Sequence, residues 1–240
     1  MKGVILQPTY LPWLGYFEMI AAADIFVIYD HVQFVKKSWH HRNRIKGPNG
    51  EILLSVPTKK APLHTALCNI DLASEYEASL TSHWTTISHA YKKAPYFSRY
   101  SQELQALYFK KYASLTDLTV TFIHFFCEHL GVSTKFITSS SFALDTSLVN
   151  STGKVVELCQ KVGIKNLYDA NGALKIIDTK IFNSNGIGIE FQQYEHPIYS
   201  QQFGKFIPYM SVLDLLLNEG ENSANVMRAG RRPPLEILIN

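Results

Sequence analysis

The sequence predicts an α/β fold: a doubly wound, mostly parallel, Rossmann-like sheet with an inserted β-hairpin and a helical segment. Short apolar runs alternate with helical patterns along much of the chain, which is typical of βαβ units. The turn signal Gly47-Pro48-Asn49-Gly50 separates two strand-like runs and predicts the hairpin. Helical spacing over 75–130 predicts the helical segment. We expect one domain over 1–240, with insertions at 32–60 and 75–130.

Apolar runs and turn residues give the expected elements in order. The strands of the main sheet are predicted at 4–6, 24–30, 135–138, 165–168 and 187–193. Helices are predicted at 13–23, 115–130, 153–162 and 174–183, and a last helix begins with Ser211 as its N-cap. The hairpin is expected at 42–57, an exposed loop at 59–70, and a linker or docking tail after Gly230.

The composition is that of a globular enzyme. The chain has 240 residues, of which 46% are hydrophobic and 18% charged, so it can bury a full core and is not disordered. The net charge of +3 is too small for a general nucleic-acid binder. No stretch approaches the ~20 apolar residues that span a bilayer. We therefore expect neither nucleic acid nor a membrane span among its partners.

The cysteines and the first residues indicate a cytoplasmic protein. Cys68, Cys127 and Cys159 are odd in number and widely spaced, which suits a reducing compartment and gives no disulfide or zinc pattern. The run from Met1 to Pro8 is too short for a signal peptide and reads as a strand. We expect no metal site, since the adjacent His40 and His41 would point to opposite faces of a strand.

The first candidate segment, Gln7 to Tyr16, lies between a predicted strand and a helix. Ligands of open α/β sheets bind where strands end, and a helix N-terminus favours an anion. Two prolines stiffen this loop, and Gly15 allows a close backbone approach. We expect substrate contacts from Gln7, Tyr10, Trp13 and Tyr16. In the alternative interpretation, Trp13 and Tyr16 are core residues of a packing loop.

The second candidate segment, Asp30 to Phe34, follows the second predicted strand. A histidine with a neutral pKa beside a carboxylate can act as a general base, so we predict His31 as the base and Asp30 as the group that orients it. Gln33 is expected to contact the substrate. A lone histidine is equally compatible with a structural role.

The third candidate segment combines basic and aromatic residues. If 42–46 is extended, Arg42, Arg44 and Lys46 share one face and form a cationic stripe for phosphate or carboxylate. Trp39 can stack on a base or a sugar ring. The alternative is a solvated basic face. The predicted substrate contacts of this segment are Lys37, Trp39, Arg42, Asn43, Arg44 and Lys46.

Two later strand ends should lie on the same edge of the sheet. The first carries Asp169 and Asn171, which alternatively form an Asx-turn. The second is an aromatic loop with Tyr194, His196 and Tyr199. We predict His196 as a reserve base and the other four side chains as substrate contacts.

At these residues the sequence resembles the WbqC-like protein family. The matching segments are 7–17, 29–34, 38–46, Tyr194, His196-Pro197, Tyr199, Gln201, 206–208 and 211–216. The family is tied to gene clusters for O-antigen and other surface polysaccharides, so the resemblance implies a role in making or decorating an unusual sugar. The opening of the chain also resembles adenylate-forming enzymes of the pantothenate-synthetase type and nucleotidylyltransferases. Those carry His-x-Gly-His where this chain has 12–16.

The leading hypothesis is a transferase that acylates or aminoacylates an amino group of a nucleotide-linked sugar. The cationic stripe would hold the pyrophosphate or a carboxylate, and Trp39 or Trp13 would stack on a ring. His31 would deprotonate the amine. The donor would be an acyl-carrier or CoA thioester.

Two alternatives stay open. One is an ATP-dependent adenylate-forming ligase or a nucleotidylyltransferase-like enzyme, for which ATP would be the cofactor. The other is a non-catalytic scaffold of the polysaccharide-assembly machinery. A homodimer is compatible with either, and the sequence does not decide the oligomeric state.

Overall fold

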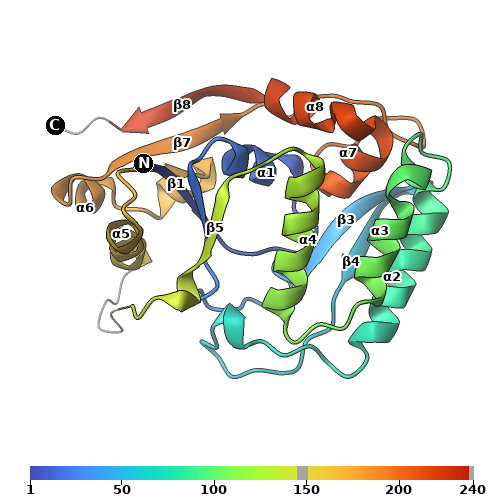
Figure 1. Cartoon of the computed structure of the whole chain (residues 1–240), viewed down its shortest axis with the longest axis horizontal. Coiled ribbons are helices and arrows are strands. Elements are labelled where there is room, and N and C mark those ends of the chain that lie inside the picture. The colour runs from blue at the N-terminus through green and yellow to red at the C-terminus, as the bar shows by residue number, and fades with distance from the viewer. Residues whose placement is uncertain (145–150, 238–240) are drawn as a thin grey trace.

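Short apolar runs form a six-stranded sheet in the computed structural model, which describes residues 1–144 and 151–237 (Figure 1). The strand order is β5-β2-β1-β6-β7-β8. The strands are β1 Lys2–Leu6, β2 Ile25–Ile28, β5 Lys135–Thr138, β6 Asn166–Asp169, β7 Gly188–Tyr194 and β8 Arg231–Ile237. Five of them pair in parallel, and β8 pairs antiparallel with β7. The predicted fold class, a mostly parallel α/β sheet of the Rossmann-like kind, is confirmed.

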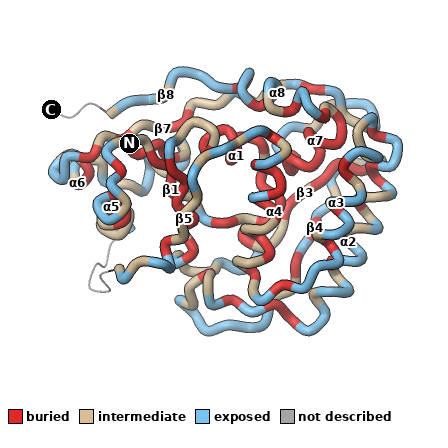
Figure 2. Tube along the Cα trace, in the orientation of Figure 1, coloured by how far each residue is buried: buried red, intermediate tan, exposed pale blue. Residues whose placement is uncertain are grey.

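Helices cover both faces of the sheet because its strands are apolar on both sides. Val4 and Phe26 face the larger core, and Ile5 and Val27 face the smaller one. The larger core contains α1 Leu14–Ala21, α4 Leu115–His129, α7 Val212–Glu219 and α8 Ser223–Ala229. The smaller core contains α5 Ser151–Val162 and α6 Thr179–Ser184. Figure 2 shows that buried residues gather in β1, α1, α4 and α7.

The two predicted insertions are both present (Figure 1), and their buried side chains belong to the larger core. The hairpin consists of β3 Arg42–Gly47 and β4 Gly50–Ser55, and it forms a separate two-stranded sheet. Gly50 has a φ of 111°, which explains the glycine in its turn. The helical segment contains α2 Tyr76–Tyr91 and α3 Phe97–Phe109 before α4. The 3-10 turns are Leu67–Asn69, Ser139–Ser141, Asn171–Lys175 and Gly220–Asn222.

Several predicted boundaries are wrong for identifiable reasons. The helix expected at 174–183 is divided into the 3-10 turn Asn171–Lys175 and the short α6. The helix that begins after Ser211 is not the last, since α8 follows it. The 59–70 loop is not wholly exposed, because Leu67 and Ile70 are buried in the core. These apolar residues lack a helix or strand period, so the sequence gives no burial signal for them.

The tail after Gly230 is the edge strand β8 rather than a linker. Its sequence begins with two arginines and two prolines, which is unusual for a strand, but an edge strand tolerates proline. Arg231 explains why the strand docks: its Nε donates to Oε1 of Glu18 at 2.5 Å, and Glu18 is fully buried on α1. Gln192 and Tyr168 donate to the other oxygen of Glu18.

A crevice is expected where β1 and β6 meet. The chain runs from β1 to β2 and β5 on one side, and β6 and β7 lie on the other side. β1 and β6 pair only through Lys2–Asn166 and Gly3–Leu167, so the register does not continue to their carboxyl ends. This is the topological switch point, where ligands of open α/β sheets bind.

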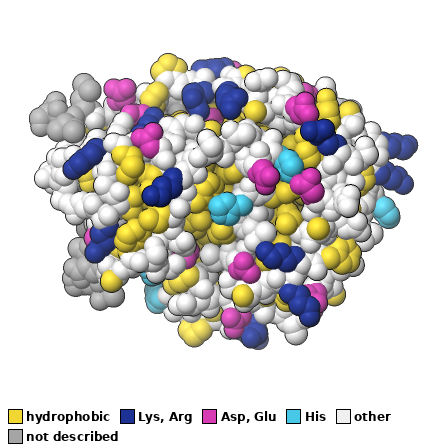
Figure 3. Space-filling model, viewed as in Figure 1, with side chains coloured by type: hydrophobic (Ala, Val, Ile, Leu, Met, Phe, Trp, Pro, Cys, Tyr) yellow, Lys and Arg dark blue, Asp and Glu magenta, His cyan; other side chains and the backbone are white. Residues whose placement is uncertain are grey.

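The surface and the helices add two observations. On the face in Figure 3, Lys and Arg side chains are interspersed with Asp and Glu rather than gathered into one basic region. Within 1–144 and 151–237, none of the helices has the length and apolar character needed to cross a membrane.

The Glu18–Arg231 pair gives a stability prediction. We expect Arg231→Met to lower the free energy of unfolding by roughly 2 kcal/mol, because a buried carboxylate loses its cation. The value is below that of a fully buried pair, since Arg231 is 43% exposed. Urea denaturation measures the change. Arg228→Met, an exposed arginine on α8, is the matched control and should change stability by less than ~0.5 kcal/mol.

Candidate functional site

Two adjoining cavities lie at the carboxyl edge of the sheet and share Thr9 and Tyr16. The first, called the aromatic cavity, has a volume of about 270 Å³. Its lining is Thr9, Pro12, Trp13, Tyr16, Trp39, Asn43, Arg44 and Tyr209. The second, called the switch-point cavity, has a volume of about 340 Å³ and lies between β1 and β6. Its lining is Ile5, Leu6, Gln7, Thr9, Tyr16, Tyr29, Val32, Ser151, Val155, Asp169, Ala173, Ile176 and Ile177.

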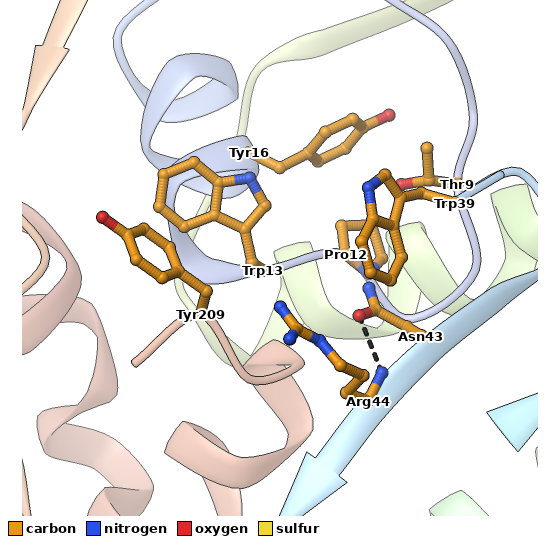
Figure 4. A pocket seen from close by; sticks show the side chains of 8 residues that line it. All are labelled: Thr9, Pro12, Trp13, Tyr16, Trp39, Asn43, Arg44 and Tyr209. Atoms are coloured by element: carbon orange, nitrogen blue, oxygen red, sulfur yellow. Dashed lines mark hydrogen bonds between the residues drawn. The ribbon is translucent and has the colours of Figure 1, made fainter. Parts of the chain in front are cut away.

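Two indole rings flank the aromatic cavity. In Figure 4 the rings of Trp13 and Trp39 stand on opposite sides of a gap, and the Arg44 side chain runs from β3 towards it. Trp13 is fixed by aromatic neighbours: its ring stacks on His196 at 6.2 Å and meets Tyr194 edge-on at 5.5 Å. Trp39 is 48% exposed. Indole rings that line a cavity can pack on a planar or saccharide ring.

Arg44 brings a positive charge to this cavity. Its guanidinium lies 5.3 Å from the centroid of the Trp39 ring, and its Nη1 donates to Glu51 at 2.8 Å. Its Nε is buried and has no hydrogen-bond partner among the described residues. A buried donor without a partner is costly, and the charge of the guanidinium beside Trp39 favours an anionic ligand.

The loop that carries Trp13 is held from outside the main sheet. The Asn43 side chain donates its Nδ2 hydrogens to the carbonyl oxygens of Tyr10 at 3.2 Å and Leu11 at 2.7 Å. Leu11 has a φ of 47°, a left-handed conformation that an isolated leucine disfavours. The amide of Val212 also donates to Pro12 O at 2.8 Å. The hairpin and α7 therefore determine the shape of this strand-end loop.

Gly15 is required for the position of Trp13. A Cβ atom built on Gly15 would lie 2.1 Å from the Trp13 ring. The close approach expected at this glycine is therefore made by the indole, which packs over the first turn of α1.

The switch-point cavity is largely aliphatic, with few polar groups. Asp169 is 9% exposed, and burial raises the pKa of its carboxyl to about 6. One oxygen accepts the Ala170 N–H at 2.7 Å, which partly opposes this rise. Gln7 accepts a hydrogen bond from His40 Nε2 at 2.6 Å through its side-chain oxygen. Burial lowers the pKa of His40 to about 4, so its ring is neutral.

Three residues that were predicted to contact the substrate are buried and hydrogen-bonded to other parts of the protein. Tyr10 is fully buried, and its hydroxyl bonds His83 at 3.0 Å and Tyr108 at 3.2 Å. Lys46 is buried, and its Nζ donates to Lys205 O at 2.7 Å. The Tyr199 hydroxyl donates to the buried Asp214 at 2.8 Å. None of the three lines either cavity. In each, the polar atom is already hydrogen-bonded to another group of the protein.

The cationic stripe is reduced to Arg44. Arg42 donates to the carbonyl of Lys37 in its own loop, and Lys46 is buried. The strand alternation is as predicted, but the loop after Ser200 covers the Lys46 end of the face. A local loop contact therefore engages Arg42, and packing by a distant segment engages Lys46.

The predicted bases are placed differently from the expectation. Asp30 accepts hydrogen bonds from Ser139 Oγ at 2.7 Å and from Ser140 N and Oγ at 2.9 and 2.7 Å. The carboxylate thus binds the turn after β5 and not the ring of His31, which is exposed and lies outside both cavity linings. The base role of His31 stays a prediction.

His196 is a structural neighbour of the aromatic cavity. Its Nδ1 donates to Pro197 O at 2.9 Å, and its Nε2 accepts the Tyr209 N–H at 3.1 Å. Burial lowers the pKa of its ring. Because backbone groups hold both nitrogens, the geometry gives His196 the task of supporting Trp13 and gives no support to a base role.

The remaining predicted residues divide between the cavities and the surface. Tyr194 supports Trp13 and donates its hydroxyl to Met227 O at 2.8 Å. Gln33 bonds His64 at 3.1 Å, and Lys37 and Asn171 are exposed. The prediction missed Tyr209, whose signal was the aromatic-rich loop before Ser211, and the aliphatic wall of the switch-point cavity. Within the described ranges, no cluster of three or more His, Cys, Asp or Glu side chains could hold a metal ion.

Comparisons with known proteins identify a family and a relative. Residues 7–226 match the model of the WbqC-like protein family. A protein of Mycobacterium tuberculosis (strain ATCC 25618 / H37Rv), named "Uncharacterized protein Rv1507c", is 30% identical over 234 residues, which are 96% of this chain and 99% of that protein. No solved structure matches the chain. The family match includes the hairpin and the lining of both cavities except Ile5 and Leu6.

Asn43 is expected to control both stability and the loop. In Asn43→Asp the new carboxylate cannot donate to the two carbonyls and lies beside them, so the free energy of unfolding should fall by about 3 kcal/mol. Urea denaturation measures the loss. The control is Asn49→Asp in the exposed hairpin turn, where aspartate is well tolerated. Equal stability of the two variants would contradict the role of Asn43.

Tyr10 is expected to act through stability alone. Tyr10→Phe removes the hydroxyl bonds to His83 and Tyr108 and should cost about 1 kcal/mol in the free energy of unfolding. The affinity for UDP- and dTDP-linked amino sugars, measured by calorimetry, should be unchanged. If the affinity fell while the stability stayed the same, Tyr10 would be a direct substrate contact and this prediction would be wrong.

Proposed function

The chain belongs to the WbqC-like protein family, and we propose that it is a transferase of surface-polysaccharide synthesis, including O-antigen. It joins an acyl or aminoacyl group to an amino group of a nucleotide-linked sugar. The observation that carries this proposal is the pair of adjoining cavities at the sheet edge, one aromatic and cationic and one aliphatic, which share Thr9 and Tyr16. Two neighbouring sites of different chemistry suit a reaction between two different substrates.

The aromatic cavity fits the nucleotide-linked sugar. Nucleobases stack on aromatic rings, and sugar rings pack their apolar faces on them, so the gap between Trp13 and Trp39 suits either. The guanidinium of Arg44 is suited to the pyrophosphate, because it is always charged and donates in a planar fork. The guanidinium lies 5.3 Å from the centroid of the Trp39 ring, beside the proposed stacking surface.

The switch-point cavity fits the group that is transferred. Its volume of about 340 Å³ lies in the range of small-molecule sites, roughly 300–1,000 Å³. The aliphatic wall favours an apolar group. The carbonyl carbon of that group would lie near Tyr16 and Thr9, where the two cavities meet.

The proposed reaction is the transfer of an acyl or aminoacyl group from a thioester to the sugar amine. The nitrogen of the neutral sugar amine bonds to the carbonyl carbon of a thioester, the C–S bond breaks, and the proton that the nitrogen loses passes to the departing thiolate. The products are an amide and a free thiol. The contribution of the protein is to hold both substrates in contact, and such positioning is worth several kcal/mol of the barrier.

Ligand affinity tests the aromatic cavity. We expect Trp39→Ala to weaken binding of UDP- and dTDP-linked amino sugars by roughly tenfold, because one stacked ring contributes about 1–3 kcal/mol. Arg44→Met should weaken binding by a similar factor. The difference in affinity between this variant and the wild type should shrink at high salt, because salt screens the attraction between the phosphates and the guanidinium. Isothermal titration calorimetry measures both.

One control variant accompanies this titration, and separate assays test the two rival functions. Phe109→Ala, an exposed aromatic on α3, should bind as the wild type does. ATP–pyrophosphate exchange in the presence of an acid would favour the adenylate-forming ligase. Binding of neither nucleotide sugars nor thioesters, with tight binding to a glycosyltransferase, would favour the scaffold and contradict the proposal.

A further inference from the structure

We propose that the switch-point cavity binds the α-ammonium form of an apolar amino acid residue. The ammonium donates to Asp169, the side chain packs on the aliphatic wall, and the carbonyl oxygen accepts from the Gln7 amide. This inference rests on the proposed function and identifies the transferred group as an apolar aminoacyl group rather than a simple acyl group.

Asp169 is the feature that requires a cation. It lies at the carboxyl end of β6 and is 9% exposed, so it has lost most of its contact with water. Its one described hydrogen bond comes from the Ala170 N–H, and none of the ion pairs in the described ranges includes it. A buried carboxylate without a counter-ion is unfavourable, and an ammonium group would neutralise it. The raised pKa of Asp169 agrees with this uncompensated charge.

The wall of the cavity selects an apolar body for that cation. Ile5 and Leu6 come from β1, Val155 from α5, and Ile176 and Ile177 from the segment after β6. Ile176 is 74% exposed, which is unusual for an isoleucine and leaves its surface free to cover a ligand. Burial of each added methylene of the ligand contributes about 0.8 kcal/mol, which is about fourfold in affinity.

The hydrogen bonds of His40 determine how the Gln7 amide is turned. The Val35 N–H donates to His40 Nδ1 at 3.3 Å, so the ring proton of the neutral imidazole lies on Nε2. Nε2–H then donates to the side-chain oxygen of Gln7 at 2.6 Å. The NH₂ group of Gln7 is left as a donor without a described partner, and Gln7 lines the cavity. A carbonyl oxygen is the acceptor that this donor fits.

The distribution of charge separates the two substrates. A phosphate would be repelled by Asp169 and attracted by Arg44, so the nucleotide belongs in the aromatic cavity. A simple acyl group would fill the aliphatic wall but leave Asp169 unpaired. An apolar aminoacyl group satisfies the carboxylate, the wall and the amide together.

A matched pair of probes tests the ammonium. Leucinamide and 4-methylpentanamide have the same carbon skeleton and amide, and only the first carries an ammonium. We expect the wild-type protein at pH 7 to bind leucinamide about 10- to 100-fold more tightly, the usual value of a hydrogen bond to a charged group. Titrations followed by NMR measure both dissociation constants.

The affinity for leucinamide should depend on pH. The affinity for leucinamide should fall as pH decreases through about 6, where Asp169 takes up a proton. It should also fall above roughly pH 8, where an α-amino group loses its charge. Binding of 4-methylpentanamide should not follow this profile.

Asp169→Asn separates the charge from the shape of the side chain. The preference for leucinamide should disappear, because the isosteric amide cannot neutralise an ammonium. The melting temperature of the free protein at pH 7 should rise: the pKa of Asp169 is raised by folding, so its ionised form destabilises the folded state above about pH 6. Asp71→Asn, at an exposed aspartate, is the control and should leave the preference intact.

Two further variants test the wall and the amide. Ala173→Phe fills the cavity and should abolish binding of leucinamide, whereas Ala106→Phe on the exposed face of α3 should not. Gln7→Leu should weaken binding of leucinamide by roughly two- to tenfold, the value of a neutral hydrogen bond.

The inference is overturned if the wild type binds both probes equally, if it prefers 4-methylpentanamide, or if Asp169→Asn keeps the preference. Nucleotide-sugar titration distinguishes this failure from failure of the proposed function. If the sugar binds and the ammonium preference is absent, only the aminoacyl assignment is wrong. If leucinamide binds as expected and no nucleotide sugar binds, the acceptor assignment is wrong instead.

Discussion

The candidate site depends on two hydrogen bonds, which the Asn43 amide donates to the carbonyls of Tyr10 and Leu11. They connect the inserted hairpin to the loop after β1 and stabilise the left-handed Leu11. The same loop carries Trp13 into one cavity and Gln7 into the other. A single buried amide, with both hydrogens used, thus couples an insertion outside the main sheet to both halves of the cleft.

Buried polar networks around Asp214 and Glu18 hold other segments of the molecule together. Asp214 on α7 accepts from Tyr91 of α2 at 2.8 Å and from Tyr199 of the loop before α7 at 2.8 Å. Burial raises the pKa of Asp214, while these donors oppose the rise. Glu18 joins α1 to β8 in the same way, because it accepts a hydrogen bond from Arg231. Such networks are strongly destabilised when one member is removed, so they fix the positions of the segments they join.

The frame and the cleft differ in how their polar groups are satisfied. Asp214 and Glu18 have several protein partners each, whereas Asp169 has one described hydrogen bond and Arg44 has a buried Nε without one. Charged groups of opposite sign thus line neighbouring cavities: Asp169, without a counter-ion among the described residues, and Arg44, which pairs with Glu51. This contrast supports a cleft that takes an anion on one side and a cation on the other.

The sequence by itself determined the strand order along the chain, the hairpin turn and the strand-end position of Gln7, Trp13 and Asp169, because apolar period and turn chemistry are local. Only the tertiary structure decided which side chains are free. Tyr10 and Lys46 look like site residues in the sequence, but distant groups such as His83 and Lys205 occupy them. Residues 231–237 look like a tail, but they pair with β7 as a strand, and Arg231 binds the buried Glu18. Burial and pairing depend on segments far apart in the chain, and no local pattern records them.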